Sequence, residues 1–151
     1  MKEKREKVIL IYGSTTGNTE TLAKGVVSGL KRGGTEVTVK DVTEADVNKL
    51  LDYDVIVLGS STWGDGELQD DFVDFYDKMD KVSLTGKKAA VFGPGDKESY
   101  PDTYCEAVNI LEERLKKCGA EIIVKNFKVD GDIEPVMEVA ESWGEEIVKS
   151  L

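Results

Sequence analysis

The alternation of short apolar runs with helical patterns is the feature that most constrains how this sequence can fold. Three runs, Val8–Tyr12, Val55–Leu58 and Ala89–Phe92, contain only apolar residues. Such runs are typical of parallel strands that are covered on both faces. Val37–Val39 and Ile122–Val124 are two further strand candidates. The pattern predicts an α/β fold in which a doubly wound parallel sheet lies between two layers of helices.

Five segments with apolar residues at helical spacing lie between and after these runs. Glycine follows the first at Gly33-Gly34 and the fourth at Gly119, which is typical of helix ends. Thr43–Asp46 resembles a capping box and predicts a short second helix through Leu51. We find no repeat and no linker, so we expect one domain over residues 1–151. The apolar positions that define the other helices are Leu22, Ala23, Val26, Val27 and Leu30; Leu68, Phe72, Phe75, Tyr76 and Met79; Ala107, Val108, Leu111, Leu115 and Cys118; and Val136, Val139, Ala140, Trp143 and Ile147.

Charge and composition exclude several functions. Lysine and arginine number 20 against 30 acidic residues, a net charge of −10, which disfavours nucleic acid and anionic membranes as partners. The chain has no histidine, which excludes Ser-His-Asp and Cys-His catalysis and histidine-ligated metals. Cys105 and Cys118 are too few for a zinc tetrad and fit structural thiols better than a disulfide framework. The basic start Lys2–Lys7 lacks the features of a signal peptide, so we expect a cytoplasmic location.

The loop after the first strand has the composition of an anion cradle. Between Ser14 and Thr19 it offers four hydroxyls and one amide, at the point where the first helix begins. A helix N-terminus attracts anions through its free N–H groups and partial positive charge. The loop lacks the lysine of a nucleoside-triphosphate loop and the glycine spacing of a dinucleotide loop. A cradle of neutral donors suits a single terminal phosphate, although an ordinary helix cap would use similar residues.

Two more loops follow strands at the same edge of the predicted sheet, where ligands of such folds bind. Ser60–Glu67 follows the third strand and holds Trp63 outside any apolar periodicity, so we expect its indole to face a flat group. The alternative is a loop aromatic that folds over the hydrophobic edge. Gly93–Tyr100 follows the fourth strand and places a second aromatic nearby.

These three loops, in this order, resemble the cofactor loops of flavodoxins. The resemblance extends from Val8 to Leu151 and leaves no room for the insertion that longer flavodoxins carry in the last strand, so the chain resembles the short-chain type. It implies the flavodoxin-like sheet order 2-1-3-4-5 and non-covalently bound FMN. It also implies a low-potential one-electron carrier rather than an enzyme, working mainly between the semiquinone and hydroquinone states.

The resemblance also implies roles for individual residues. The first loop and Ser61 would hold the phosphate, and Trp63 would lie on one face of the flavin ring. Tyr100 would lie on the other face, with Tyr104 as a rival for that role. The Gly64 carbonyl would meet flavin N5, and N–H groups near Gly95 would meet the pyrimidine edge. The complete set of cofactor-binding candidates is Ser14, Thr15, Thr16, Gly17, Asn18, Thr19, Ser61, Thr62, Trp63, Gly64, Asp65, Gly95, Asp96, Tyr100, Tyr104 and Cys105.

Acidic residues crowd the loops and helix near the expected ring. Each charge ~10 Å away costs an anionic flavin ~0.4 kcal/mol at water-like dielectric, roughly 20 mV for one electron. We therefore expect a low potential, and redox partner proteins that carry basic patches and meet a monomer. The acidic positions are Asp65, Glu67, Asp70, Asp71, Asp74, Asp77 and Asp80, and Asp96, Glu98, Asp102 and Glu106.

Two other functions share this fold. A signalling receiver needs an aspartate at the end of the third strand, where this chain has Leu58-Gly59-Ser60. An FMN-dependent quinone reductase needs longer loops for its substrates, and turnover of NADPH with a quinone would reveal it.

Overall fold

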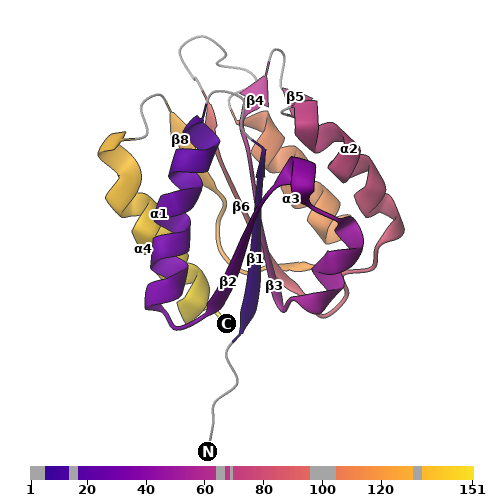
Figure 1. Ribbon diagram of the computed structural model, residues 1–151, viewed down its shortest axis with the longest axis horizontal. Coiled ribbons are helices and arrows are strands. Elements are labelled where there is room, and N and C mark those ends of the chain that lie inside the picture. Colours follow the sequence, from indigo (N-terminus) through magenta and orange to yellow (C-terminus); the bar gives the residue numbers. More distant parts are fainter. Residues whose placement is uncertain (1–5, 14–16, 64–66, 69, 96–104, 131–133) are drawn as a thin grey trace, which may run out of the picture.

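The computed structural model describes residues 6–13, 17–63, 67–68, 70–95, 105–130 and 134–151. Figure 1 shows a central sheet with α1 and α4 on one side and α2 and α3 on the other. The two faces of the sheet carry separate cores. Leu22, Val26 and Trp143 belong to the core under α1 and α4. Phe72 and Leu111 belong to the core under α2 and α3, so both sides of each central strand are buried, as their continuous apolar runs predict.

The sheet has the predicted strand order. Its strands run β2-β1-β3-β6-β7, and every pairing in it is parallel. Because the last position is shared by two short strands, β7 and β8, which both pair with β6, the order corresponds to the predicted 2-1-3-4-5. The strands are β1 (Lys7–Gly13), β2 (Glu36–Asp41), β3 (Val55–Ser60), β6 (Lys88–Gly95), β7 (Glu121–Ile122) and β8 (Phe127–Asp130).

Four α-helices occupy the predicted first, third, fourth and fifth helical segments. Helix α1 ends with basic residues in its last turn and with Gly33 as its C-cap. Gly119 follows α3 and has a φ of +99°. The helices are α1 (Asn18–Arg32), α2 (Asp70–Lys78), α3 (Glu106–Lys117) and α4 (Met137–Lys149), and the 3-10 turns are η1 (Val42–Glu44), η2 (Val47–Asp52), η3 (Met79–Lys81) and η4 (Glu134–Val136).

The predicted short helix from the Thr43–Asp46 capping box is wrong. The Asp41 carboxylate instead accepts a hydrogen bond from the Thr43 N–H at 2.9 Å and caps η1. The Asp46 carboxylate accepts one from the Asn48 N–H at 2.9 Å and caps η2. Because each aspartate serves its own turn, the segment forms two short 3-10 turns rather than one α-helix.

The last predicted strand, Ile122–Val124, is also only partly correct. The chain leaves the sheet after Ile122 and re-enters it as β8, and two side chains anchor the segment between. The Trp143 indole N–H donates to the Lys125 carbonyl at 2.9 Å. The Asn126 amide donates to the Glu112 carboxylate at 2.7 Å. The first of these contacts satisfies the Lys125 carbonyl, a backbone group that a continuous strand would pair in the sheet.

Strand β6 extends beyond the predicted Phe92 and includes Gly93, Pro94 and Gly95, which the sequence places in a loop. Pairing with β8 continues to Gly95 opposite Asp130. A proline is tolerated here because pairing with β3 ends at Phe92, so the missing N–H falls beyond the last partner on that side. The sequence also does not predict a small antiparallel hairpin, β4 (Thr62–Trp63) with β5 (Glu67–Leu68), whose two-residue strands are too short to show a period.

Helices α1 and α4 pack closely enough that glycine is required where they cross. A Cβ on Gly29 would lie 2.0 Å from the Glu141 carbonyl oxygen, and a Cβ on Gly144 would lie 2.4 Å from the Val26 carbonyl oxygen. At the edge of this contact, the Arg32 guanidinium pairs with Glu141 at 3.1 Å and with Glu145 at 3.2 Å. Because these ion pairs are exposed, the close backbone approach contributes more to the helix packing than they do.

We therefore expect Gly29→Ala to lower the free energy of unfolding by about 1–3 kcal/mol, because the added methyl forces the helices apart. The exposed Lys31→Ala change in the same helix is the control and should change it by less than about 0.5 kcal/mol. Urea unfolding followed by far-ultraviolet circular dichroism measures both. Equal stability of the two variants would contradict the packing.

Candidate functional site

The strand order brings the three predicted loops to one edge of the sheet. Gly13 at the end of β1 pairs with Ser60 at the end of β3, and Gly59 pairs with Phe92 in the next strand, β6. Strand β1 has β2 as its neighbour on one side and β3 as its neighbour on the other. The sheet therefore has a topological switch point at the carboxyl ends of β1 and β3, and ligands of such sheets bind at positions of this kind (Figure 1).

The start of α1 presents a buried hydroxyl at this edge. Thr19 is only 1% exposed, and within the described part of the chain its Oγ1 has no hydrogen-bond partner. The N-cap residue of α1 is Gly17, with a φ of +92° and no side chain to cap the helix, and its carbonyl accepts from the N–H and the hydroxyl of Thr21, both at 2.9 Å. Buried hydroxyls in proteins are nearly always bonded. Thr19 therefore fits a hydrogen bond to an anion held at the helix N-terminus.

The ends of β3 and β6 lie unusually close together. A Cβ on Gly93 would lie 2.2 Å from the Ser60 carbonyl oxygen, so only glycine fits there. Ser60 is fully buried and its hydroxyl donates to the Ser61 carbonyl at 2.9 Å, while Ser61 itself is half-buried. The sequence analysis treated Gly93 as a loop residue, and the signal for this close approach was the Gly-Pro-Gly run that contains it.

Cys105 connects the start of α3 to the same edge. It is fully buried and has a φ of +52°, the only positive φ among the described non-glycine residues. Its Sγ lies 3.5 Å from the Gly93 carbonyl oxygen and 3.9 Å from the Val129 carbonyl oxygen, so the thiol is placed between the ends of β6 and β8. The predicted site residue Gly95 is the last residue of β6, at the same edge of the sheet.

The described residues thus bring together Gly17, Asn18 and Thr19 at one strand end, Ser61 at the next, and Gly95 and Cys105 at the third. For Thr62 and Trp63 only the backbone, in the β4–β5 hairpin, is described. The remaining predicted site residues lie outside the described residues: Ser14, Thr15, Thr16, Gly64, Asp65, Asp96, Tyr100 and Tyr104.

Acidic side chains act on Tyr12, near the end of β1. Burial raises the pKa of the Tyr12 phenol, and the nearby carboxylates of Glu20, Asp41 and Glu44 raise it further. Not all of the acidic residues counted near the ring lie there, however. Asp80 lies in η3 beyond the far end of α2, where it pairs with Arg114. Nine residues of helix at 1.5 Å each carry the chain roughly 13 Å from its start, which separates Asp80 from the loops.

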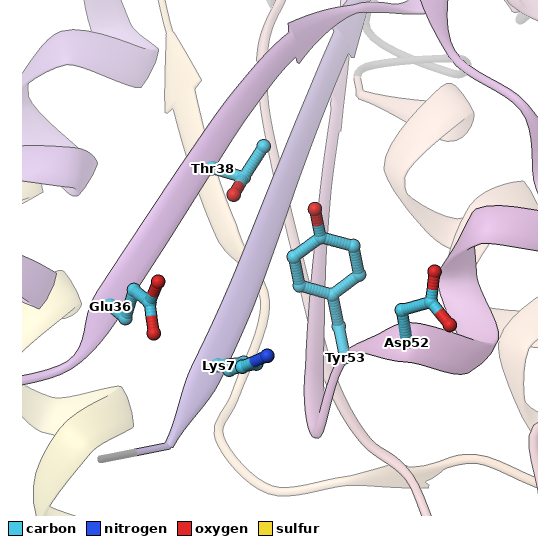
Figure 2. A pocket seen from close by; sticks show the side chains of 5 residues that line it. All are labelled: Lys7, Glu36, Thr38, Asp52 and Tyr53. Atoms are coloured by element: carbon cyan, nitrogen blue, oxygen red, sulfur yellow. The ribbon is translucent and has the colours of Figure 1, made fainter.

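A hollow of about 380 Å³ lies toward the opposite edge of the sheet from the candidate site. Figure 2 shows Lys7 and Glu36 at the starts of neighbouring strands, with Asp52 and Tyr53 from the turn before β3. The Lys7 backbone N–H donates to the Asp54 carboxylate at 3.0 Å. None of the predicted site residues lines this hollow, so it is separate from the candidate site.

Comparison with known proteins identifies the family. The family model described as Flavodoxin matches residues 10–143. The chain belongs to the flavodoxin family. It is 42% identical to the flavodoxin of Maridesulfovibrio salexigens over 149 residues, which cover 96% of this chain and 99% of that protein. The crystal structure of oxidised Flavodoxin 1 from Bacillus cereus superposes with a TM-score of 0.90 at 42% identity, covering 96% of this chain and 99% of that one.

Membership confirms three predictions at the level of the family. Flavodoxins are FMN-binding electron-transfer proteins and not enzymes, so the predicted flavodoxin resemblance, the electron-carrier class and the cofactor are all confirmed. Within the described residues, no helix combines the length and the apolar character needed to cross a membrane.

We expect the two thiols to differ sharply in reactivity. Cys105 is fully buried, and burial raises the pKa of the Cys118 thiol, with Asp80 adding to the rise and Arg114 opposing it. Because the thiolate is the reactive form, native protein should react with a disulfide reagent slowly and at one thiol, faster as pH rises above the ordinary cysteine pKa. The Cys118→Ser variant should react only after urea is added. A rapidly reacting thiol in that native variant would contradict the burial of Cys105.

Proposed function

We propose that the carboxyl edge of the sheet binds FMN through its three loops and passes single electrons to partner proteins. The observation that carries this proposal is the buried Thr19 hydroxyl at the N-terminus of α1, which has no hydrogen-bond partner among the described residues. A phosphate there would receive a hydrogen bond from Thr19 as well as the N–H groups of the helix. The proposed contact residues are Ser14, Thr15, Thr16, Gly17, Asn18, Thr19, Ser61, Thr62, Trp63, Gly64, Asp65, Gly95, Asp96, Tyr100, Tyr104 and Cys105.

The donor set of the chain suits a phosphate ester that ends in a single phosphate. Its first loop contains hydroxyls, an amide and glycine but no lysine, and the donors are therefore neutral. A solved structure with the same fold, at 16% identity and a TM-score of 0.85, is that of a flavodoxin from Fusobacterium nucleatum bound to flavin mononucleotide. FMN supplies the redox chemistry, since its ring accepts and releases electrons one at a time.

We propose that this chain works mainly between the semiquinone and hydroquinone states of FMN. Burial and the carboxylates of Glu20, Asp41 and Glu44 raise the pKa of Tyr12, and the same carboxylates would oppose negative charge on a nearby ring and so lower the potential of the second reduction step. The Gly64 carbonyl is the proposed hydrogen-bond acceptor for the ring at its N5 position, and Trp63 and Tyr100 are proposed to exclude water from its faces.

We further propose that residues 1–151 form one domain that acts as a monomer in the cytoplasm. The net charge of −10 favours redox partners that carry basic patches. Such encounters are weak and depend on salt, as suits a carrier that must leave each partner after one electron.

A reductive titration of the FMN-loaded protein, followed by absorbance, tests the redox proposal. We expect a long-wavelength band of the neutral radical to rise at half reduction and then to disappear. Direct bleaching in one two-electron step would contradict the proposed states. Failure to retain FMN through dialysis would contradict the proposed site itself.

Thr19→Val tests the proposed phosphate contact. We expect FMN to bind about 10–100-fold more weakly, because a hydrogen bond to a charged group contributes about 1.5–3 kcal/mol. Riboflavin, which lacks the phosphate, is the matched control ligand and should bind both proteins equally. The cofactor-free variant should be at least as stable as the parent, because a buried unpaired hydroxyl is removed. Equal loss of FMN and riboflavin would place the effect elsewhere. Fluorescence titration measures both affinities.

A further inference from the structure

Strand β2 forms one edge of the sheet, and no strand among the described residues pairs with its outer side. On its inner side the Glu36 N–H donates to the Glu6 carbonyl at 3.0 Å, and the parallel pairing with β1 continues from there to Asp41. Alternate residues of a strand direct their N–H and C=O groups to opposite sides. The backbone groups of Val37 and Val39 therefore point away from β1, toward the open side.

The side chains of β2 leave this edge accessible. Val39 is 42% exposed, Val37 and Thr38 are half-buried, and the charged residues Glu36 and Lys40 are exposed. Val39 lies on the face that carries α1, whereas Glu36 and Thr38 line the hollow on the other face (Figure 2). An accessible edge strand is a template on which a strand of another chain can pair.

The sequence of β2 is complementary to itself. Residues 36–40 read Glu-Val-Thr-Val-Lys. When two copies run antiparallel about a two-fold axis at Thr38, Glu36 of each copy lies opposite Lys40 of the other. Val37 of each copy then lies opposite Val39 of the other. Opposite charges and β-branched side chains are both favourable as directly opposed pairs in an antiparallel sheet.

The backbone of β2 fits the same register. Val37 and Val39, whose groups point outward, would form the hydrogen-bonded pairs across the two-fold axis. Glu36 and Lys40 would fall at the non-hydrogen-bonded positions, where opposed Cα atoms approach to about 4.5 Å and side chains lie closest.

Neighbouring registers lack this match. An axis between two residues sets an outward-pointing residue opposite an inward-pointing one, so the ladder of hydrogen bonds does not form. An axis at Val37 or Val39 keeps hydrogen bonds but sets neither Glu36 nor Lys40 opposite the other. A lysine on an edge strand usually discourages pairing with another chain. Only the register about Thr38 gives Lys40 a carboxylate partner.

We propose that β2 is a self-association surface, through which two copies of this chain join their sheets antiparallel about Thr38. The contact is isologous, because the same five residues meet on both copies. Stable complexes bury roughly 1,600 Å² in total, which exceeds what one pair of short strands supplies. We therefore expect a reversible dimer that forms as the concentration rises, while the proposed monomeric carrier predominates in dilute solution.

The arrangement leaves the candidate site free in both copies. Because the two β2 strands run in opposite directions, the carboxyl edges of the two sheets point to opposite ends of the joined sheet. The inference goes beyond the proposed function and does not depend on FMN binding.

Charge-reversal variants of the FMN-loaded protein test the proposed pairing. Lys40→Glu and Glu36→Lys each set like charges opposite one another at both ends of the contact, and they change the net charge in opposite directions. The variant that carries both substitutions restores opposite charges. Lys117→Glu, at an exposed position at the end of α3, changes the net charge as Lys40→Glu does and is the matched control. Sedimentation equilibrium measures association up to about 1 mM. Salt of about 0.15 M screens the repulsion between the two acidic copies.

We expect the average mass of the parent to rise with concentration from that of one chain, 16.6 kDa, toward twice that value. Each single charge reversal should weaken association about tenfold or more, because two attractive pairs become repulsive. An equal mixture of Lys40→Glu and Glu36→Lys should associate like the parent, as should the doubly substituted chain. This recovery also shows that the variants are folded. Lys117→Glu should associate like the parent.

Hydrogen exchange of the parent tests the register. The amides of Val37 and Val39 should exchange more slowly as the concentration rises, whereas the amide of Thr38, which faces β1, should not change. A parent that remains a monomer at about 1 mM would overturn the proposal. Equal association in Lys40→Glu and Lys117→Glu, or no recovery in the mixture, would also overturn it. A dimer that leaves the exchange at Val37 and Val39 unchanged would assign association to another surface and would equally overturn it.

Discussion

The parallel pairing of β1 with β3, in a register that sets Gly13 opposite Ser60, is the constraint on which the rest of the structure depends. Since β2 lies on the other side of β1, this pairing creates the switch point. It also brings the end of β1, where the hydroxyl-rich loop begins, beside the end of β3, where the loop that carries Trp63 begins. The same order extends to β6, whose end lies so close to Ser60 that only glycine fits at position 93. A one-residue change in the register of β3 would reverse the faces of its side chains and disperse the loops.

The helices adapt to this sheet in two different ways. On one face, α1 and α4 cross with glycine at the contact, which fixes the start of α1 relative to the sheet. On the other face, α2 and α3 bury phenylalanine and leucine, and an Arg114 guanidinium lies 4.0 Å from the centre of the Tyr76 ring. The first arrangement positions the buried Thr19 hydroxyl. The second leaves one side of α2 facing η1 and η2.

Charge is distributed unevenly over this frame. The carboxylates of Glu20, Asp41 and Glu44 lie near Tyr12 at the end of β1, while Asp80 is paired with Arg114 in η3, beyond the far end of α2. The net charge of −10 alone does not distinguish these positions. Their placement depends on how the helices lie on the sheet.

The sequence by itself determined the fold class, and it singled out the hydroxyl-rich segment before α1 as a candidate anion site. The continuous apolar runs are typical of buried parallel strands, and the expectation for the hydroxyl-rich segment comes from its own composition and its place before a helix. The tertiary structure decided the rest, for reasons of long-range contact. Val124 lies outside the sheet because Trp143 bonds the Lys125 carbonyl and Glu112 bonds the Asn126 amide, and neither Trp143 nor Glu112 is close to this segment in sequence. Gly93–Gly95 are in a strand because β8 pairs with them, and residues 42–52 form two turns because Asp41 and Asp46 each cap one. Local propensity does not encode such pairings, since several chain segments must meet before any of them forms.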